Sequence, residues 1–109
     1  MDHEPIPVGT LDMLILQTLA AGNKFHGFEI AEAIQARSED VLCVEEGSLY
    51  PALQRLLVNG WITDEWGRTA ENRRARYYKL TTPGRKQLDR ERAKYRRVSE
   101  AIAKILQPA

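Results

Sequence analysis

The polar side chains between residues 48 and 55 carry hydrogen-bond donors and acceptors that suit a nucleic acid. The amide of Gln54 can pair with adenine through two hydrogen bonds, and the guanidinium of Arg55 can reach guanine or a phosphate. The hydroxyl groups of Ser48 and Tyr50 can bind phosphate oxygens. Because a B-DNA major groove is about 12 Å wide and admits one α-helix, a helix presenting these side chains would be a groove-reading element.

A second set of candidate residues lies in the basic stretch of residues 68–86. This stretch contains seven basic residues and a single acidic one, Glu71. Three of its arginines are predicted to bind phosphates along a DNA backbone or in a minor groove: Arg73, Arg74 and Arg76. The alternative interpretation is a solvated charged surface without a ligand.

The formal net charge of +1 conceals a strong asymmetry along the chain. Residues 1–65 hold three basic and eleven acidic residues, a net charge of −8. Residues 66–109 hold thirteen basic and four acidic residues, a net charge of +9. Such an asymmetry within a small domain favours a surface for a polyanion, and we expect the acidic half to face away from it.

Length and composition restrict the class of protein. A chain of 109 residues with 43% hydrophobic and 28% charged residues is typical of one globular domain. No apolar run approaches the roughly 18 residues of a transmembrane helix, and the first five residues lack the features of a secretory signal. The single cysteine, Cys43, suits a reducing compartment, so we expect a cytoplasmic location.

The groove-reading candidates are predicted to lie on one helix that begins at residue 47 or 48 and ends at residue 59. With Ser48 as N-cap, Pro51 falls in the first turn, where it costs no intrahelical hydrogen bond. The helical period places on the core side Leu49, Leu53, Leu56 and Leu57. It places on the opposite side Tyr50, Pro51, Gln54, Arg55 and Val58. The alternatives are a Tyr50 buried in the core and a merely solvated Gln54 and Arg55.

Two further helices are expected before this one. The first begins after a Thr10 N-cap and ends at Gly22, although a strand could also accommodate its apolar run. It is apolar on nearly every side and therefore needs burial on more than one face. The second covers residues 26–37, and its apolar side is formed by Phe28, Ala31 and Ile34. A connector follows, whose expected core anchors are Val41, Leu42 and Val44.

A β-hairpin is predicted after residue 60. Alternating side chains over residues 61–66 and 76–81 indicate two strands, which a polar loop of residues 67–75 joins. The alternation places Tyr78 and Leu80 on one face, with Tyr77 and Lys79 on the other. We expect packing between sheet and helices, rather than ligand stacking, from Trp61, Trp66 and Tyr78.

The last predicted helix starts with Thr82 as N-cap and Pro83 at its first position, and ends near Leu106. It carries an apolar stripe that its own chain has little left to cover. Together with the apolar first helix, this stripe predicts a homodimer. The expected dimer contacts are Leu11, Leu14, Leu88, Tyr95, Val98, Ile102 and Ile105.

This order of elements predicts a winged helix-turn-helix, a mainly α fold with a small β-hairpin (α+β). We expect residues 1–82 to form the DNA-binding domain and residues 83–109 the dimerisation helix. No motif of a phosphate loop, a nucleophile elbow or a metalloprotease is present, so we predict a non-enzyme without cofactors. His3, His26 and Cys43 lack the paired spacing of zinc ligands. The alternative function is a winged-helix module that binds protein, for which seven basic residues are unnecessary.

The sequence also resembles the PadR family of bacterial transcriptional regulators over roughly residues 9–88. The resemblance rests on Gly9-Thr10-Leu11 with Leu14-Ile15-Leu16, on His26-Gly27-Phe28-Glu29-Ile30, and on Gly47-Ser48-Leu49-Tyr50-Pro51-Ala52-Leu53. It continues through Leu56, Gly60-Trp61-Ile62, Arg73-Arg74, Tyr77-Tyr78-Lys79-Leu80-Thr81 and Gly84. With its single last helix, the chain is similar to the short branch of the family.

This resemblance implies a dimeric winged-helix repressor that binds an inverted-repeat operator and releases it when a small-molecule effector binds. It carries the family's helix contacts onto Ser48, Tyr50 and Gln54, and its wing contacts onto Arg73, Arg74 and Arg76. In some short members, an aromatic residue of the last helix lines a drug-binding pore at the dimer centre. The aromatic residue in the stripe of this chain is Tyr95, and the stripe has no tryptophan.

Overall fold

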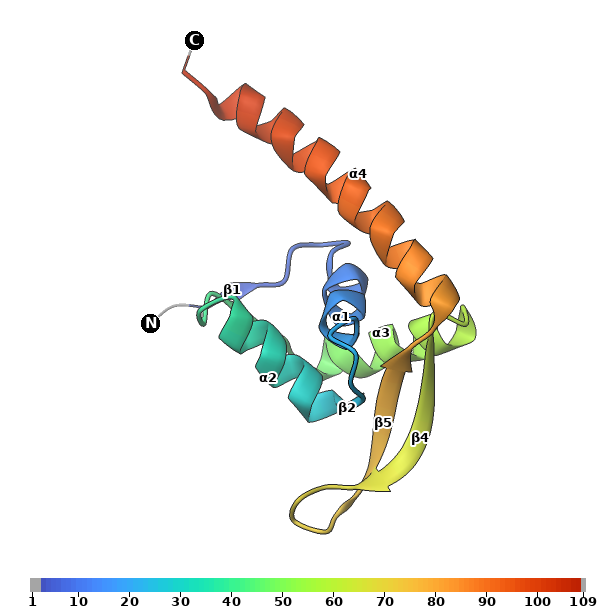
Figure 1. The fold of residues 1–109 in the computed structure, drawn as a ribbon. Coiled ribbons are helices and arrows are strands. Elements are labelled where there is room, and N and C mark those ends of the chain that lie inside the picture. The colour runs from blue at the N-terminus through green and yellow to red at the C-terminus, as the bar shows by residue number, and fades with distance from the viewer. Residues whose placement is uncertain (1–2, 109) are drawn as a thin grey trace.

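The computed structural model describes residues 3–108 and has a helical body from which a long helix and a hairpin project (Figure 1). Met1, Asp2 and Ala109, at the outer ends of the two predicted regions, lie outside the described residues. The helices are α1 (Leu11–Leu19), α2 (Gly27–Arg37), α3 (Glu46–Val58) and α4 (Thr82–Leu106). The strands are β1 (Glu4–Pro5), β2 (Phe25–His26), β3 (Leu42–Cys43), β4 (Ile62–Arg68) and β5 (Arg74–Leu80). None of the helices described has the length and apolar character needed to cross a bilayer.

The core lies where α1, α2 and α3 pack together next to the base of the hairpin. Its fully buried side chains include Ile15 and Leu16 of α1, Ile30 of α2, and Leu53 and Leu56 of α3. Each helix contributes the apolar stripe that a helical period of 3.6 residues creates. The predicted winged-helix fold, and the leucine side of α3 with it, are confirmed.

α1 begins after its predicted N-cap Thr10, whereas the starts of α3 and α4 differ from the predicted ones by one or two residues. α3 begins at Glu46, so Pro51 lies in its second turn rather than its first, and Ser48 is not the N-cap. The start moves because the extended Glu45 already offers its carbonyl oxygen to the N–H groups of Ser48 and Leu49. At α4 the N-cap is Thr81, not Thr82, since the Thr81 hydroxyl oxygen accepts a hydrogen bond from the N–H of Gly84.

The hairpin is longer, and its loop shorter, than the alternation predicted. β4 and β5 pair antiparallel from Ile62 with Leu80 up to Arg68 with Arg74, which leaves residues 69–73 as the loop. β2 pairs with the other edge of β5 and completes a three-stranded sheet. The strands continue past Gly67 because the ring of Tyr77 lies across this glycine, 2.9 Å from where a Cβ would be. The Tyr77 hydroxyl donates a hydrogen bond to the carbonyl oxygen of Arg68 at 3.0 Å.

Three side chains expected in the core are exposed instead. Phe28 is 64% exposed because the buried face of α2 runs through Gly27, Ile30 and Ile34, about 100° away around the helix. The side chain of Val41 is also exposed. Val41 instead contacts the N-terminal segment through its main chain, because its carbonyl oxygen accepts a hydrogen bond from the N–H of Glu4. Trp66 is 55% exposed, whereas Trp61 and Tyr78 pack on the core as predicted.

The start of α4 lies tightly on the hairpin base, and its remainder projects beyond the body (Figure 1). Gly84 is buried, and a Cβ there would collide with the carbonyl oxygen of Trp61. Leu88, one turn further, is the last fully packed apolar residue of the helix. Beyond it the stripe is exposed at Tyr95, Val98, Ile102, Ile105 and Leu106.

Candidate nucleic-acid interface

The outer side of α3 presents three of the predicted contact residues to solvent: Ser48, Tyr50 and Gln54, here called the recognition face. Leu49, Ala52, Leu53 and Leu56 anchor the opposite side of the helix in the core. Tyr50 is 48% exposed and does not belong to the core. Its ring rests on the first residue of α2, where Gly27 leaves room: a Cβ at Gly27 would lie 3.0 Å from the Tyr50 hydroxyl oxygen.

Arg55 also lies on the exposed side of α3, but its guanidinium forms an ion pair. Its Nη2 atom donates a hydrogen bond to Oδ1 of Asp12 on α1 at 2.8 Å. The guanidinium is therefore held toward α1. Sequence patterns missed this pair because its members are 43 positions apart and belong to different helices.

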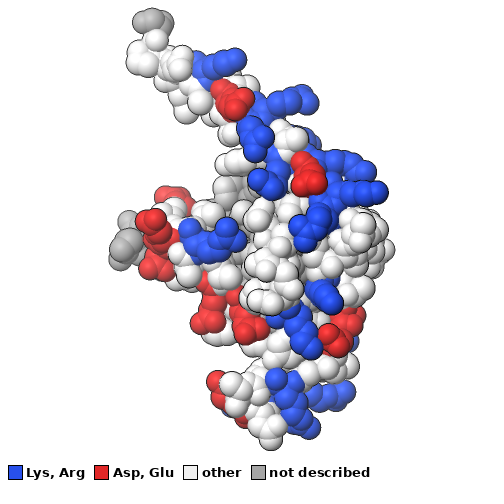
Figure 2. Space-filling view, in the orientation of Figure 1, with Lys and Arg blue, Asp and Glu red and all other residues white. Residues whose placement is uncertain are grey.

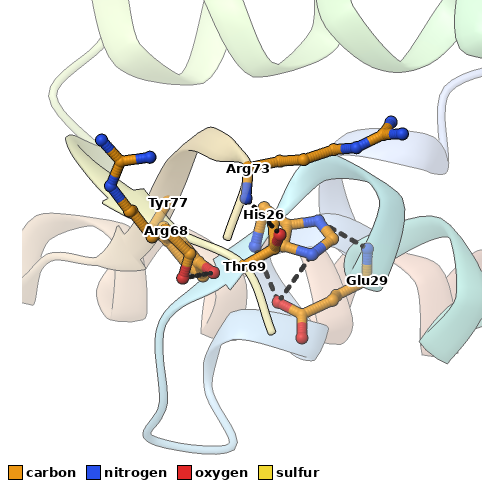
Figure 3. A network of polar contacts seen from close by, with 6 residues as sticks. All are labelled: His26, Glu29, Arg68, Thr69, Arg73 and Tyr77. Atoms are coloured by element: carbon orange, nitrogen blue, oxygen red, sulfur yellow. Dashed lines mark hydrogen bonds and ion pairs between the residues drawn. The ribbon is translucent and has the colours of Figure 1, made fainter. Parts of the chain in front are cut away.

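The wing, defined as residues 62–80, presents its three predicted contact arginines in three different environments. The guanidinium of Arg73 extends from the loop, and Figure 3 shows it pointing away from the polar contacts at the tip. The guanidinium carbon of Arg74 lies 4.3 Å from the centre of the Trp66 ring. That of Arg76 lies 5.0 Å from the same ring, and its Nε atom is 3.0 Å from Oδ2 of Asp64.

The tip of the wing is an ordered turn. The N–H of Thr69 donates to the carbonyl oxygen of Arg73 at 2.8 Å, and the N–H of Arg73 donates to the Thr69 hydroxyl oxygen at 3.1 Å. Asn72 has a φ of +62°, which asparagine tolerates better than most residues, and its carbonyl oxygen accepts from Nη1 of Arg68 at 3.2 Å. These bonds hold the backbone of the loop from which the Arg73 side chain extends.

The middle of β5 packs against the start of α2 (Figure 3). His26 and Glu29 form a capping box, in which each side chain accepts a hydrogen bond from the other residue's N–H group. The His26 ring meets the Tyr77 ring edge-on at 5.5 Å. Among residues 3–108, no three side chains of His, Cys, Asp or Glu gather in a group that could hold a metal ion.

A hollow of about 480 Å³ separates the wing from the helices. Tyr50 lines it from α3, while Trp66, Arg74 and Arg76 line it from the wing. Tyr78 also lines it, and burial raises the pKa of its hydroxyl above the ordinary value of 10.0, so this group stays neutral at physiological pH. Tyr50 of the recognition face and two arginines of the wing thus border one concave surface.

Acidic side chains lie closer to this surface than we expected. Glu29, Glu32 and Asp40 line a second hollow, of about 850 Å³, that α2 shares with the first turns of α3. Figure 2 shows the acidic side chains around α2 and the basic ones along α4 and the wing. The acidic half of the sequence therefore adjoins the recognition face instead of lying wholly away from it.

Comparison with known proteins places this fold and these residues in a family. Residues 15–90 match the sequence model of a family described as "Transcriptional regulator PadR-like family". A transcriptional regulator structure from Clostridium thermocellum is 28% identical, with 91% of this chain and 95% of that chain covered and a TM-score of 0.82. A PadR family transcription regulator from Clostridium difficile is also 28% identical, with 91% and 100% covered and a TM-score of 0.76.

A third similar structure is that of Bacillus subtilis PadR in complex with operator DNA. It is 22% identical, with 73% of this chain and 46% of that chain covered and a TM-score of 0.64. This similarity is one of fold. The family match covers most of the chain, and the two bacterial regulators share a quarter or more of its residues over nearly its full length. The chain belongs to the PadR-like family of transcriptional regulators.

Proposed function

We propose that this chain is a dimeric repressor that binds an inverted-repeat operator. α3 enters the major groove and the wing follows the adjacent DNA backbone. The observation that carries this proposal is the shared hollow, because Tyr50 of α3 and Arg74 and Arg76 of the wing border it together. A single duplex can therefore meet both elements at once.

The predicted contact residues take distinct roles in this proposal. Gln54 reads a base edge, while Ser48 and Tyr50 bind phosphate oxygens. Arg73, Arg74 and Arg76 bind the backbone beside the groove. Arg55 contributes only after it exchanges the carboxylate of Asp12 for a phosphate.

The exposed stripe of α4 supports the dimer. Tyr95, Val98 and Ile102 are each about half exposed, at 51%, 47% and 51%, and Ile105 is 80% exposed. Contiguous apolar side chains of this kind mark an interface. A second copy of α4 packed on this stripe about a twofold axis would relate two recognition faces by that axis, which is the symmetry of an inverted repeat.

The expected effector is proposed to lie beside Tyr95. A hollow of about 290 Å³ between α1 and α4 is lined there by Met13, Leu14 and Tyr95, with Arg92 at its edge. Its apolar side chains, with two arginines, Arg92 and Arg96, at the same hollow, suit a small aromatic molecule that carries a negative charge. Replacing Tyr95 with alanine should abolish effector-induced release of DNA. Because Tyr95 also belongs to the proposed dimer stripe, sedimentation of the same variant separates a loss of the effector response from a loss of the dimer.

The operator complex of Bacillus subtilis PadR supports the DNA-binding part of the proposal, since that protein shares this winged-helix fold. The direct test is a gel shift at low salt with the DNA upstream of the gene. Binding of a short duplex with an inverted repeat is the expected result. No binding at low salt would reject the proposed function and favour the protein-binding alternative.

Two variants separate base reading from phosphate contacts. Gln54→Ala should cost about 1–3 kcal/mol at one base position and relax the sequence preference there. Gln107→Ala, at the exposed end of α4, is its matched control. Arg73→Ala combined with Arg74→Ala should instead weaken binding to all sequences and reduce the salt dependence by about two charges.

A further inference from the structure

Trp66 is the aromatic residue whose place in the wing is least explained by packing. It is 55% exposed although it lies in the middle of β4. Its antiparallel partner in the register is Arg76, and Arg74 lies diagonally beside it, two residues earlier in β5. Since alternate residues of a strand share a face, these three side chains form one side of the wing. That side also borders the hollow shared with Tyr50.

The two arginines beside this indole differ in whether a carboxylate pairs with their guanidinium group. Arg76 forms an ion pair with Asp64 at 3.0 Å, which neutralises much of its charge. Arg74 lies closer to the ring, at 4.3 Å, and among residues 3–108 no carboxylate forms an ion pair with it. A guanidinium that stacks on an aromatic ring does so through its flat face, so its N–H edge stays available for a phosphate.

The opposite side of the wing has no such arrangement. There the ring of Tyr77 lies across Gly67, and the cation nearest to that ring, Lys24 at 5.7 Å, forms an ion pair with Glu65 at 3.3 Å. Lys79, also on this side, is exposed and pairs in register with Thr63. Only the side that carries Trp66 combines an exposed indole with an arginine lacking an acidic partner, within the described residues.

We infer that Trp66 is a positioning residue of the DNA interface that acts through Arg74. Its indole holds the Arg74 guanidinium in one orientation, with the N–H edge free, before DNA arrives. Less side-chain entropy is then lost on binding than for an unrestrained arginine. This inference rests on the proposed DNA-binding function and adds to it the reason why one wing arginine is pre-arranged.

The test is a double-mutant cycle with Trp66→Ala, Arg74→Ala and the combined variant. Affinity for a mixed-sequence duplex of about 40 base pairs is measured over a salt series, because phosphate contacts do not depend on sequence. Trp66→Ala should weaken binding about twofold to fivefold and lower the salt slope toward that of Arg74→Ala. In the Arg74→Ala background, Trp66→Ala should have almost no further effect. Additive losses would overturn the inference, because Trp66 would then act independently of Arg74.

Two controls separate positioning from a general loosening of the wing. Trp66→Phe keeps an aromatic face and should restore most of the affinity, whereas Lys79→Ala removes a charge from the opposite side and should leave the Trp66–Arg74 coupling unchanged. Failure of Trp66→Phe to restore binding above the Trp66→Ala level would count against the inference.

A measurement on the free protein distinguishes this inference from the proposed function. In NMR spectra without DNA, the side-chain protons of Arg74 should be shifted upfield by the indole ring, and Trp66→Ala should remove this shift. Unshifted Arg74 protons would overturn the inference even where the wild-type protein binds DNA. If the wild-type protein shows the shift but binds no duplex at low salt, the proposed function is rejected, and a role of Trp66 in DNA binding with it.

Discussion

Helices α1 and α4 both carry many apolar side chains, but these side chains are buried to very different extents. Ile15, Leu16 and Leu19 of α1 are at most 1% exposed. Ile102 and Ile105 of α4 are 51% and 80% exposed. α1 is covered by the rest of its own chain, whereas most of α4 projects beyond the body (Figure 1).

The difference shows that an apolar helix surface predicts burial without telling which chain provides it. α1 packs against α2, α3 and α4, so its apolar side chains are covered by this chain itself. Leu11 and Leu14, two of the expected dimer contacts, are partly buried against this core. The support for a dimer therefore comes from α4, and the following four predictions address this contrast.

The largest expected effect is on stability, from Leu16→Ala in α1. This change opens a cavity in a fully packed core and should lower the free energy of unfolding by about 2–5 kcal/mol. Urea unfolding at two protein concentrations should give the same loss at both. Ile102→Ala in α4 should instead act through association, so its effect should depend on protein concentration. A concentration-independent loss of similar size from both variants would contradict the contrast.

The next effect concerns association. Val98→Asp combined with Ile102→Asp places two charges in the exposed stripe and should weaken the dimer at least a hundredfold, or by about 3 kcal/mol, because buried charges without partners are costly. Helical content should be unchanged, since Val98 and Ile102 are each about half exposed and neither belongs to the buried core of the chain. Sedimentation at micromolar concentration measures the outcome. Arg97→Asp with Lys104→Asp, on the opposite side of α4, is the control, and equal dissociation by both pairs would argue against an interface at the stripe.

A smaller effect is expected from Asp12→Asn, which tests whether α1 is only structural. The substitution removes the carboxylate that holds Arg55 at 2.8 Å and should cost about 0.2–1 kcal/mol of stability, the usual range for exposed ion pairs. Since it frees Arg55 and removes a negative charge, affinity for a mixed-sequence duplex should rise modestly. Thermal unfolding and a salt titration measure the two quantities. Unchanged DNA affinity would mean that Arg55 does not reach the backbone.

The smallest effect is a pH dependence at the junction of α1 and α4. Burial, followed by the nearby charge of Asp12, raises the pKa of Glu91 above its ordinary value of 4.5, although Gln87 and Lys94 counteract this in part. The folded chain then binds this proton more tightly than the unfolded chain, so stability should fall as the pH rises from 4.5 through the raised pKa. Glu91→Gln should remove this part of the slope, while Glu100→Gln, at an exposed position of α4, should keep it. Identical pH profiles for all three proteins would contradict a shifted Glu91.

Much of the fold follows from local patterns. The leucine side of α3, the exposure of Tyr50 and Gln54, the order of helices and strands and the stripe of α4 all depend on spacing within one element. The extent of the hairpin was underestimated, because the contact of Tyr77 with Gly67 joins residues on different strands. The core position assigned to Phe28 was wrong because the smaller Gly27 and the aliphatic Ile30 take the buried side of α2.

Local sequence patterns were sufficient to predict the family, the winged-helix architecture and the positions of the basic wing and of the exposed helix face. Three features could be found only in the folded chain: the ion pair of Asp12 with Arg55, the exposed Trp66 beside Arg74, and the burial of α1 but not of α4 by the rest of the chain. The physical reason is the range of the interactions. Periodicity and capping act over a few neighbouring residues, whereas these contacts form between distant segments that meet only when the whole chain has folded.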